Sequence, residues 1–144
     1  MFKIKILIFL LGFNLVTAQT DETENQENVP FQIIEDLPII PGCEEIALEE
    51  RRNCFQLKIF DHIKKNFNYP AEAFKKNIKG RVIVTFAIEK DGSVSIDNVR
   101  GPHPLLENEA KRIISLLPAM KPGFFRDKPV RVTMSIPITF HLDK

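Results

Sequence analysis

The chain has 144 residues, 44% hydrophobic and 27% charged, and its 20 Lys and Arg nearly balance its 19 Asp and Glu. Twelve Phe can build a core, and six Gly with ten Pro are too few for a low-complexity chain, so the composition predicts one modest folded domain and excludes disorder throughout. Scattered basic residues also argue against a nucleic-acid-binding protein, because neutralising phosphates requires Lys and Arg clustered on one face.

Residues 1–18 have the pattern of a secretory signal peptide. Two lysines within Met1–Lys5 precede an apolar stretch from Ile6 to Val16, and small or compact residues end at Ala18. A membrane-spanning helix needs about 20 apolar residues, which is longer than this stretch. We therefore expect cleavage after Ala18 and export, with an uncleaved inner-membrane anchor as the alternative.

Residues 19–42 are predicted to be a tether and an extended lead-in. Gln19 to Asn28 is polar or acidic throughout, cannot bury apolar surface and is expected to be disordered. Prolines recur among apolar residues from Val29 to Pro41, which indicates an extended segment lying on the domain rather than a helix. The domain itself is predicted to span residues 43–144.

The chain has two cysteines, Cys43 and Cys54. An exported protein meets an oxidising compartment, and Pro41-Gly42 favours a turn just before Cys43, so the sequence predicts a disulfide bond between them. Two buried thiols or a redox pair are the alternatives, although the Cys-x-x-Cys spacing typical of a redox pair is absent.

Two helices are predicted before the first strand of the domain. From Cys54 to Asn66 the apolar residues recur at every fourth position, as on one face of an amphipathic helix. Pro70, which follows Tyr69, suits the first turn of a second short helix, and Gly80 is expected to end that helix.

The next predicted element along the chain is a β-hairpin. Apolar and polar residues alternate from Arg81 to Lys90, and Asp91-Gly92 is a tight-turn signal before the second strand. The alternation slips after Ile96, which predicts a β-bulge near Asp97 and Asn98.

A third helix is predicted to carry an apolar stripe from Leu106 to Leu117 and to be ended by Pro118. Pro122-Gly123 and Asp127–Pro129 then indicate a surface loop before the last strand.

The last strand has the clearest pattern, since apolar and polar residues alternate without interruption from Val130 to Leu142. One face of this strand is therefore predicted to lie on a core and the other to face water. Pro137 would remove a ladder hydrogen bond from a central strand, so its natural place is a sheet edge. The predicted fold class is α+β, a three-stranded antiparallel sheet with helices packed on one face. An open edge of this kind can bind an extended peptide, or it can simply be capped.

Several short motifs also follow one another in a characteristic order. They are Tyr69-Pro70, Ile78–Val82, Asp91-Gly92, Leu117-Pro118, Lys121–Gly123 and Ile136–Phe140. The ordered set, from about Cys54 to Leu142, resembles the C-terminal domain of TonB, the periplasmic energy transducer. Pro41–Glu44 together with Cys54-Phe55 resembles the form of this domain common in Bacteroidetes envelopes.

The resemblance implies a peptide-binding function in the periplasm. TonB domains bind the TonB box, a short N-terminal segment of outer-membrane receptors that adds as a strand beside the last strand of the domain, and a pull then opens the receptor for uptake. The implied binding edge comprises Val130, Arg131, Val132, Thr133, Met134, Ser135, Ile136, Thr139 and Phe140, with His141 on the same face as the polar members. The motif residues implied to be structural are Tyr69, Pro70, Gly80, Asp91, Gly92, Pro118 and Pro137.

The N-terminal region departs from a full transducer, which has a transmembrane helix bearing a functional histidine and a long Pro-rich spacer. Here the apolar stretch lacks His, and residues 19–42 would reach roughly 80 Å when fully extended. The expected partner is a TonB-dependent outer-membrane receptor, with a complete TonB motor complex or a second copy of this chain as alternatives. The alternative function is an envelope assembly module that self-associates through its edge strand without transducing energy.

No catalytic residue, metal site or cofactor is predicted. His62, His103 and His141 are scattered, and the sequence has neither a Gly-rich phosphate loop nor a Gly-x-Ser-x-Gly motif. The acidic residues around Glu44 and Glu49 are expected to form a solvated face. We therefore expect a non-enzymatic protein.

Overall fold

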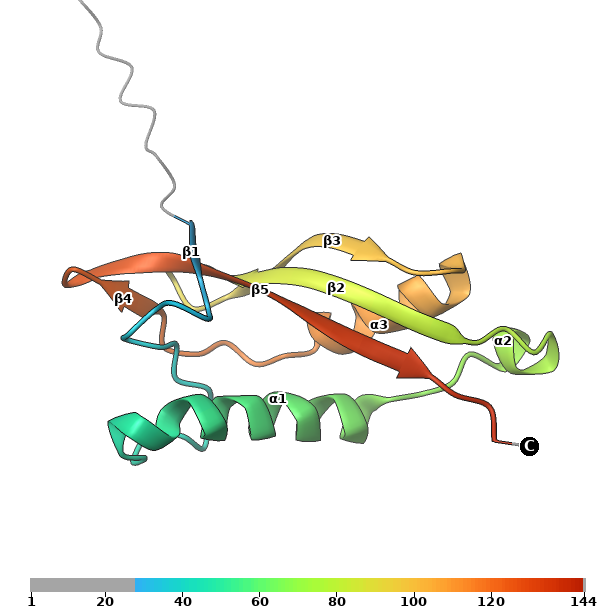
Figure 1. The fold of residues 1–144 in the computed structure, drawn as a ribbon, viewed down its shortest axis with the longest axis horizontal. Helices are drawn as coiled ribbons and strands as arrows, with labels where there is room; N and C mark the ends of the chain where they lie inside the picture. Colours follow the sequence, from blue (N-terminus) through green and yellow to red (C-terminus); the bar gives the residue numbers. More distant parts are fainter. Residues whose placement is uncertain (1–27, 144) are drawn as a thin grey trace, which may run out of the picture.

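A long antiparallel pair of strands, β2 (Gly80–Ile88) and β5 (Lys128–Phe140), forms the centre of the sheet in the computed structural model, which describes residues 28–143 (Figure 1). β3 (Val94–Arg100) pairs antiparallel with β2, and β1 (Asn28–Pro30) pairs parallel with β5, which gives the order β1-β5-β2-β3. A short strand, β4 (Gly123–Phe125), pairs with the first residues of β5. The predicted α+β class is confirmed, but the sheet has two short strands more than expected.

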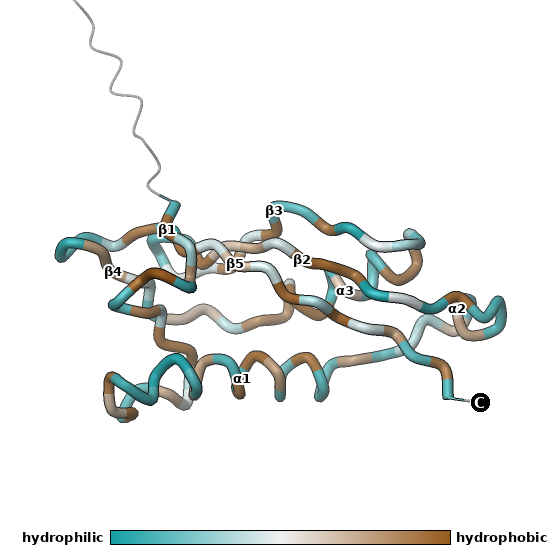
Figure 2. Tube along the Cα trace, viewed as in Figure 1, coloured by the Kyte–Doolittle hydropathy of each residue, from teal (hydrophilic) through white to brown (hydrophobic). Residues whose placement is uncertain are grey.

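Three α-helices and one 3-10 turn complete the fold. They are η1 (Leu48–Glu50), α1 (Arg51–Asn66), α2 (Ala71–Lys75) and α3 (Pro104–Ser115). α3 packs against β2 and β3, whereas α1 contacts α3 and runs along the side of the sheet where β5 lies (Figure 1). Figure 2 shows hydrophobic and hydrophilic residues alternating along α1, as the amphipathic pattern predicted.

The core lies between the sheet and these helices. Alternate residues of β2 and β5 are buried there, and they meet the apolar faces of α1 and α3 in one continuous cluster. Burying one large aliphatic or aromatic side chain stabilises a fold by roughly 1.5–3 kcal/mol, so this cluster holds the helices on one face of the sheet. Its most completely buried large members include Phe55, Phe86, Leu106, Ile113 and Phe140.

The β2–β3 hairpin and its bulge are confirmed. Thr85 lies opposite Asn98 and Phe86 opposite Ile96, so Asp97 is the extra residue on β3. Gly92 has a φ of 86°, and a Cβ atom there would lie 1.7 Å from the carbonyl oxygen of Met120. Only glycine therefore fits this turn without moving the backbone that packs on it.

The helix limits differ from those expected. α1 begins at Arg51 rather than at Cys54. α2 ends at Lys75, well before Gly80, because Asn77 adopts a left-handed conformation with φ of 55° and the Ile78 amide donates to the carbonyl of Ala73. Gly80 instead begins β2. α3 also ends at Ser115, before Pro118.

The predicted surface loop before the last strand is instead a tight hairpin between β4 and β5. Its two turn residues, Arg126 and Asp127, have φ of 50° and 63°. Positive φ at both central residues is the geometry of a type I′ turn, for which Asn-Gly and Asp-Gly are the usual sequence signals. The sequence lacks that signal here, which explains why β4 was not predicted.

Residues 28–42, assigned from the sequence to the tether and lead-in, belong to the packed unit. Val29, Phe31, Ile34, Leu37 and Ile40 are all buried. The guanidinium of Arg52 donates to the carbonyl oxygens of Phe31 and Ile34 at 2.6 and 3.0 Å, which fixes this segment on α1. The expected signal peptide and the polar tether up to residue 27 lie outside the described residues.

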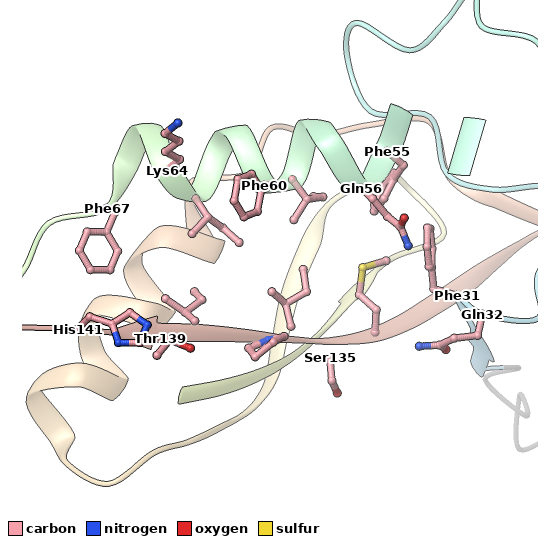
Figure 3. Close-up of a pocket in the computed structure, with 16 residues that line it drawn as sticks. Phe31, Gln32, Phe55, Gln56, Phe60, Lys64, Phe67, Ser135, Thr139 and His141 are labelled. Atoms are coloured by element: carbon pink, nitrogen blue, oxygen red, sulfur yellow. The ribbon is translucent and has the colours of Figure 1, made fainter. Parts of the chain in front are cut away.

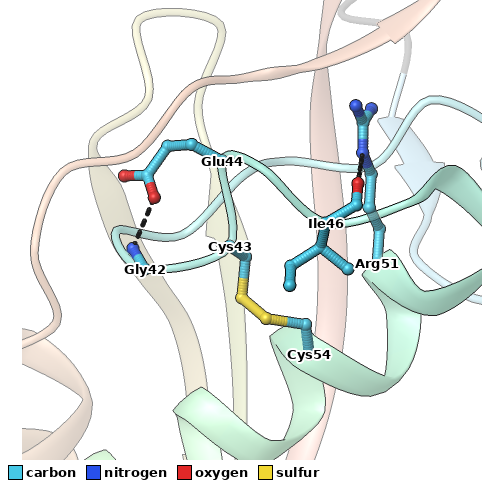
Figure 4. The surroundings of a disulfide bond; sticks show 6 residues. All are labelled: Gly42, Cys43, Glu44, Ile46, Arg51 and Cys54. Atoms are coloured by element: carbon cyan, nitrogen blue, oxygen red, sulfur yellow. Dashed lines mark hydrogen bonds between the residues drawn. A yellow bond between two sulfur atoms is a disulfide. The ribbon is translucent and has the colours of Figure 1, made fainter.

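The predicted disulfide bond joins Cys43 to Cys54, whose Cα atoms lie 6.0 Å apart (Figure 4). The bond ties the lead-in to the first turn of α1. Beside it, the carboxylate of Glu44 accepts a hydrogen bond from the amide of Gly42, which has a φ of 99°. None of the helices within residues 28–143 is long and apolar enough to cross a membrane.

Candidate functional site

The outer edge of β5, opposite its ladder with β2, is only partly paired. β1 lies along this edge from Arg131 to Thr133, and the amide of Phe31 donates to the carbonyl of Thr133 at 3.0 Å. The chain then turns away, and Met134 to Phe140 pair with β2 alone in the described part of the chain. The open edge is therefore shorter than expected, because the protein's own β1 pairs with the stretch from Arg131 to Thr133.

β4 does not cover this edge. In a two-residue hairpin, the residues that flank the turn exchange hydrogen bonds, so Lys128 and Val130 direct their backbone groups toward β4. Backbone N–H and C=O groups alternate in direction along a strand. Those of the even-numbered residues of β5 therefore all point to the same side of the strand, where both β4 and β2 lie. β4 thus continues the ladder on the inner side of β5, and the predicted edge residue Val130 is turned inward.

The same alternation identifies which backbone N–H and C=O groups of β5 point away from β2, toward the open edge. Because the carbonyl of Thr133 points outward to Phe31, the backbone groups of Ser135, Pro137 and Thr139 also point outward. Ser135 and Thr139 each offer an N–H and a C=O, whereas Pro137 offers only a C=O. Pro137 therefore lies on the open part of the strand, where its missing N–H costs no ladder hydrogen bond, as the sequence predicted.

A groove with a volume of about 770 Å³ lies between this open edge and α1 (Figure 3). In Figure 3 the rings of Phe60 and Phe67 lie on the β5 side of the helix, Phe31 closes the other end, and Ser135 points away from α1. The residues that line the groove are mostly apolar: Phe31, Gln32, Phe55, Gln56, Ile59, Phe60, Ile63, Lys64, Phe67, Met134, Ser135, Ile136, Pro137, Ile138, Thr139 and His141.

The groove is lined in part by exposed apolar side chains. Phe60 is 64% exposed and Phe67 is 37% exposed, and both line the groove. Contiguous exposed apolar surface in a soluble protein commonly marks a binding site. An open strand edge beside an apolar groove can therefore bind an extended polypeptide through both its backbone and its side chains.

A family model described as Gram-negative bacterial TonB protein C-terminal matches residues 65–142, more than half of the chain and including all of β5. This chain belongs to the TonB C-terminal domain family. The resemblance inferred from the motifs is thus confirmed.

Solved structures of the Helicobacter pylori TonB C-terminal domain are similar to this TonB domain. An NMR structure of residues 179–285 of that protein has 26% identity and a TM-score of 0.46, and it covers 70% of this chain and 88% of its own. A second, of residues 194–285, has 28% identity and a TM-score of 0.40, and it covers 62% and 96%. No curated protein gave a significant match.

Arg131, expected at the binding edge of the TonB domain, is engaged on the opposite face of the sheet from α1. Its guanidinium donates to Glu89, just after β2, at 2.9 Å, to Asp97 of β3 at 2.5 Å and to the side-chain oxygen of Asn28 of β1 at 3.1 Å. The hydrogen bond that Arg131 donates to the carboxylate of Asp97 raises the pKa of the Arg131 guanidinium, and the side chain of Arg131 is only 12% exposed. Arg131 therefore links β5 to β1, to β3 and to the turn that follows β2, and it holds β1 on the edge.

Tyr69, of the Tyr69-Pro70 motif, lies at the far end of β5. Its hydroxyl donates to the carbonyl of Ile78 at 2.5 Å, and its ring packs edge-on against Phe140 with 5.7 Å between centroids. Phe67 packs on the same Phe140 ring at 5.1 Å. This aromatic cluster fixes the end of β5 relative to the end of α1, and thus sets the width of the groove there.

The three histidines of the TonB domain do not come together. His62 lies 2.8 Å from the carbonyl of Ile113, His103 accepts from the amide of Leu105 at the start of α3, and His141 lines the groove. Within residues 28–143, no group of three or more His, Cys, Asp or Glu is placed to hold a metal ion.

Sequence reasoning missed the contribution of α1 to the candidate site. Phe60 lies off the every-fourth-residue stripe that predicted the buried face of this helix, so no role was assigned to it from the sequence. An exposed phenylalanine next to that stripe is the signal that could have marked the groove.

Proposed function

We propose that this TonB domain binds the TonB-box segments of outer-membrane receptors by adding them as a strand to the open edge of β5. TonB C-terminal domains interact with outer-membrane receptors, and family membership gives this chain a TonB-like role in transport. The observation that carries the proposal is the row of outward backbone groups at Ser135, Pro137 and Thr139 beside the groove.

The other open edge of the sheet is a poorer binding site. β3 carries the bulge at Asp97, and bulges blunt an edge by interrupting the regular row of backbone groups. The hollow beside β3 is smaller and is lined by polar residues such as Asn98, Glu107 and Lys111. The open part of β5 has no bulge and borders apolar surface, which favours an incoming strand there.

The domain acts in the periplasm in this proposal. The signal pattern of residues 1–18 supports export, and the receptor segment that TonB domains bind is reached from the periplasm. Cleavage after Ala18 releases the chain from the membrane, whereas an uncleaved segment anchors it. The mass of the exported protein distinguishes the two, since only the uncleaved form retains residues 1–18.

Hydrogen exchange tests strand addition residue by residue. The isotope-labelled chain from residue 19 is titrated with synthetic peptides that cover the N-terminal segments of TonB-dependent receptors from the same organism. In the free domain we expect the amides of Ser135 and Thr139 to exchange quickly and those of Ile136 and Ile138 to be protected by the ladder with β2.

Bound peptide is expected to protect Ser135 and Thr139 and to leave Ile136 and Ile138 unchanged, which provides a control within one strand. Fast exchange at Ser135 and Thr139 under saturating peptide contradicts the proposal. A dimer that forms with rising concentration and ignores the peptides supports the self-associating assembly module instead.

A further inference from the structure

The groove beside β5 also restricts which peptides fit. In paired strands, residues directly opposite one another direct their side chains to the same face of the sheet. Met134, Ile136 and Ile138 of β5 line the groove, whereas the side chain of Ser135 points away from α1 (Figure 3). The residues of an added strand that lie opposite Met134, Ile136 and Ile138 therefore point into the groove, toward α1.

The wall of the groove formed by α1 determines which side chains of an added strand fit. Ile59, Phe60, Ile63 and Phe67 supply the α1 side of the groove. Among residues 28–143, Lys64 is the one Lys or Arg in the lining, and no carboxylate lines the groove. A basic side chain pointing inward would lose water without gaining an ion pair, whereas an apolar one would cover exposed apolar surface.

We propose that the groove selects extended peptides with three apolar side chains at alternate positions, i, i+2 and i+4. This inference depends on strand addition at β5, as proposed above, and adds the specificity of the same site. The intervening residues lie opposite Ser135, Pro137 and Thr139 and point to the solvent face, where polar side chains are accepted. Backbone pairing contributes affinity for any extended peptide, and burial of the three apolar side chains favours peptides with the alternating pattern.

The partner is an extended polypeptide because the groove continues an existing strand interface. β1 already occupies the same edge from Arg131 to Thr133, and the groove begins at Phe31, where β1 leaves the edge. An added strand would therefore extend the row of hydrogen bonds that β1 begins. A compact ligand could fill the groove but would leave the outward groups of Ser135 and Thr139 unpaired.

Two peptides of identical composition test the selection. One alternates, Ser-Val-Thr-Ile-Ser-Val-Thr, and the other groups its apolar residues, Ser-Thr-Val-Ile-Val-Ser-Thr. The alternating peptide can direct all its apolar side chains into the groove, and the grouped peptide cannot. We expect the alternating peptide to bind at least about tenfold more tightly, and a version with Lys in place of Ile to lose that advantage.

A matched pair of variants identifies the groove as the cause. Phe60 and Leu57 are both exposed on α1, at 64% and 55%, but only Phe60 lines the groove. Phe60→Ser is expected to weaken binding of the alternating peptide about tenfold, and Leu57→Ser by less than about twofold. Because both side chains are exposed in the free domain, neither change is expected to unfold it.

The outcomes separate this inference from the proposed function. If the two peptides bind equally tightly and both protect Ser135 and Thr139, the groove does not select the alternating pattern, but strand addition is still supported. Failure of both peptides, and of the receptor peptides, to protect these amides overturns both. A peptide-free dimer that Phe60→Ser abolishes assigns the groove to a second copy of the chain and also overturns the inference.

Discussion

The amide nitrogen of Phe31 donates to the carbonyl oxygen of Thr133 at 3.0 Å, and this is the point at which β1 leaves the edge of β5. The ring of the same Phe31 packs against Phe55 of α1 with 4.7 Å between centroids. One residue thus ends the self-paired part of the edge and closes one end of the groove. The N-terminal segment therefore defines where an added strand can begin.

The disulfide bond is expected to stabilise this arrangement by joining the N-terminal segment to α1. Replacing both Cys43 and Cys54 with serine should lower the free energy of unfolding by about 3 kcal/mol, mainly because the unfolded chain gains freedom. Urea denaturation measures the difference. A reducing agent should destabilise the unmodified protein similarly and leave the double variant unaffected; equal midpoints for the two proteins would contradict a stabilising role.

Arg131 is predicted to hold β1 in place. Arg131→Met removes the bonds to Glu89, Asp97 and Asn28 and leaves two carboxylates without their cation, so we expect a loss of about 2–3 kcal/mol of stability. The amide of Phe31 should also exchange faster, since β1 loosens.

Arg112 provides the control for this variant. It pairs with Glu109 on the surface of α3, donates to the carbonyl of Asn66 at 2.6 Å and is 45% exposed, so Arg112→Met should cost clearly less stability than Arg131→Met. Equal losses for the two arginine variants, or unchanged exchange at Phe31, would show that Arg131 does not secure β1.

Gly92 is predicted to be indispensable to the β2–β3 hairpin. In Gly92→Ala the new methyl group would overlap the carbonyl oxygen of Met120, and the residue would also be strained at a φ of 86°. We expect a loss of roughly 2–4 kcal/mol in thermal denaturation. The neighbouring Ser93→Ala removes only the exposed hydrogen bond that the Ser93 hydroxyl donates to Asp91 and should cost less than about 1 kcal/mol; a comparable loss there would rule out the clash as the cause.

Much of this fold could be predicted from the sequence because its long elements have strong periodicity. The alternation in β5 and the slip at Asp97 both predicted features that the structure confirms. β1 and β4 are too short to show a period, since each has 3 residues and Pro30 lies within β1. Their positions depend on partners distant in the sequence, which local pattern does not encode.

The candidate site was predicted only in part for the same reason. The polar face of β5 marked the right strand, but the state of its edge depends on where the N-terminal segment returns to pair with Arg131–Thr133. The groove depends on the distance between α1 and β5, which packing around Phe67, Tyr69 and Phe140 sets. Phe60 beside the apolar stripe of α1 is a local signal for one wall of the groove, but neither the pairing of the edge nor the width of the groove has a signature in any one stretch of the sequence.

Pro137 is predicted to limit the affinity of the open edge. Pro137→Ala would add one outward N–H in the middle of the open stretch, so an added strand could form one more hydrogen bond. A hydrogen bond contributes about 1 kcal/mol net, so peptide affinity should rise roughly fivefold, as measured by calorimetry. Pro129 also lies on the outer edge of β5 but beyond β1 and away from the groove, so Pro129→Ala should leave the affinity unchanged. If Pro137→Ala binds the peptide no better than the unmodified domain, the peptide does not pair with this part of β5.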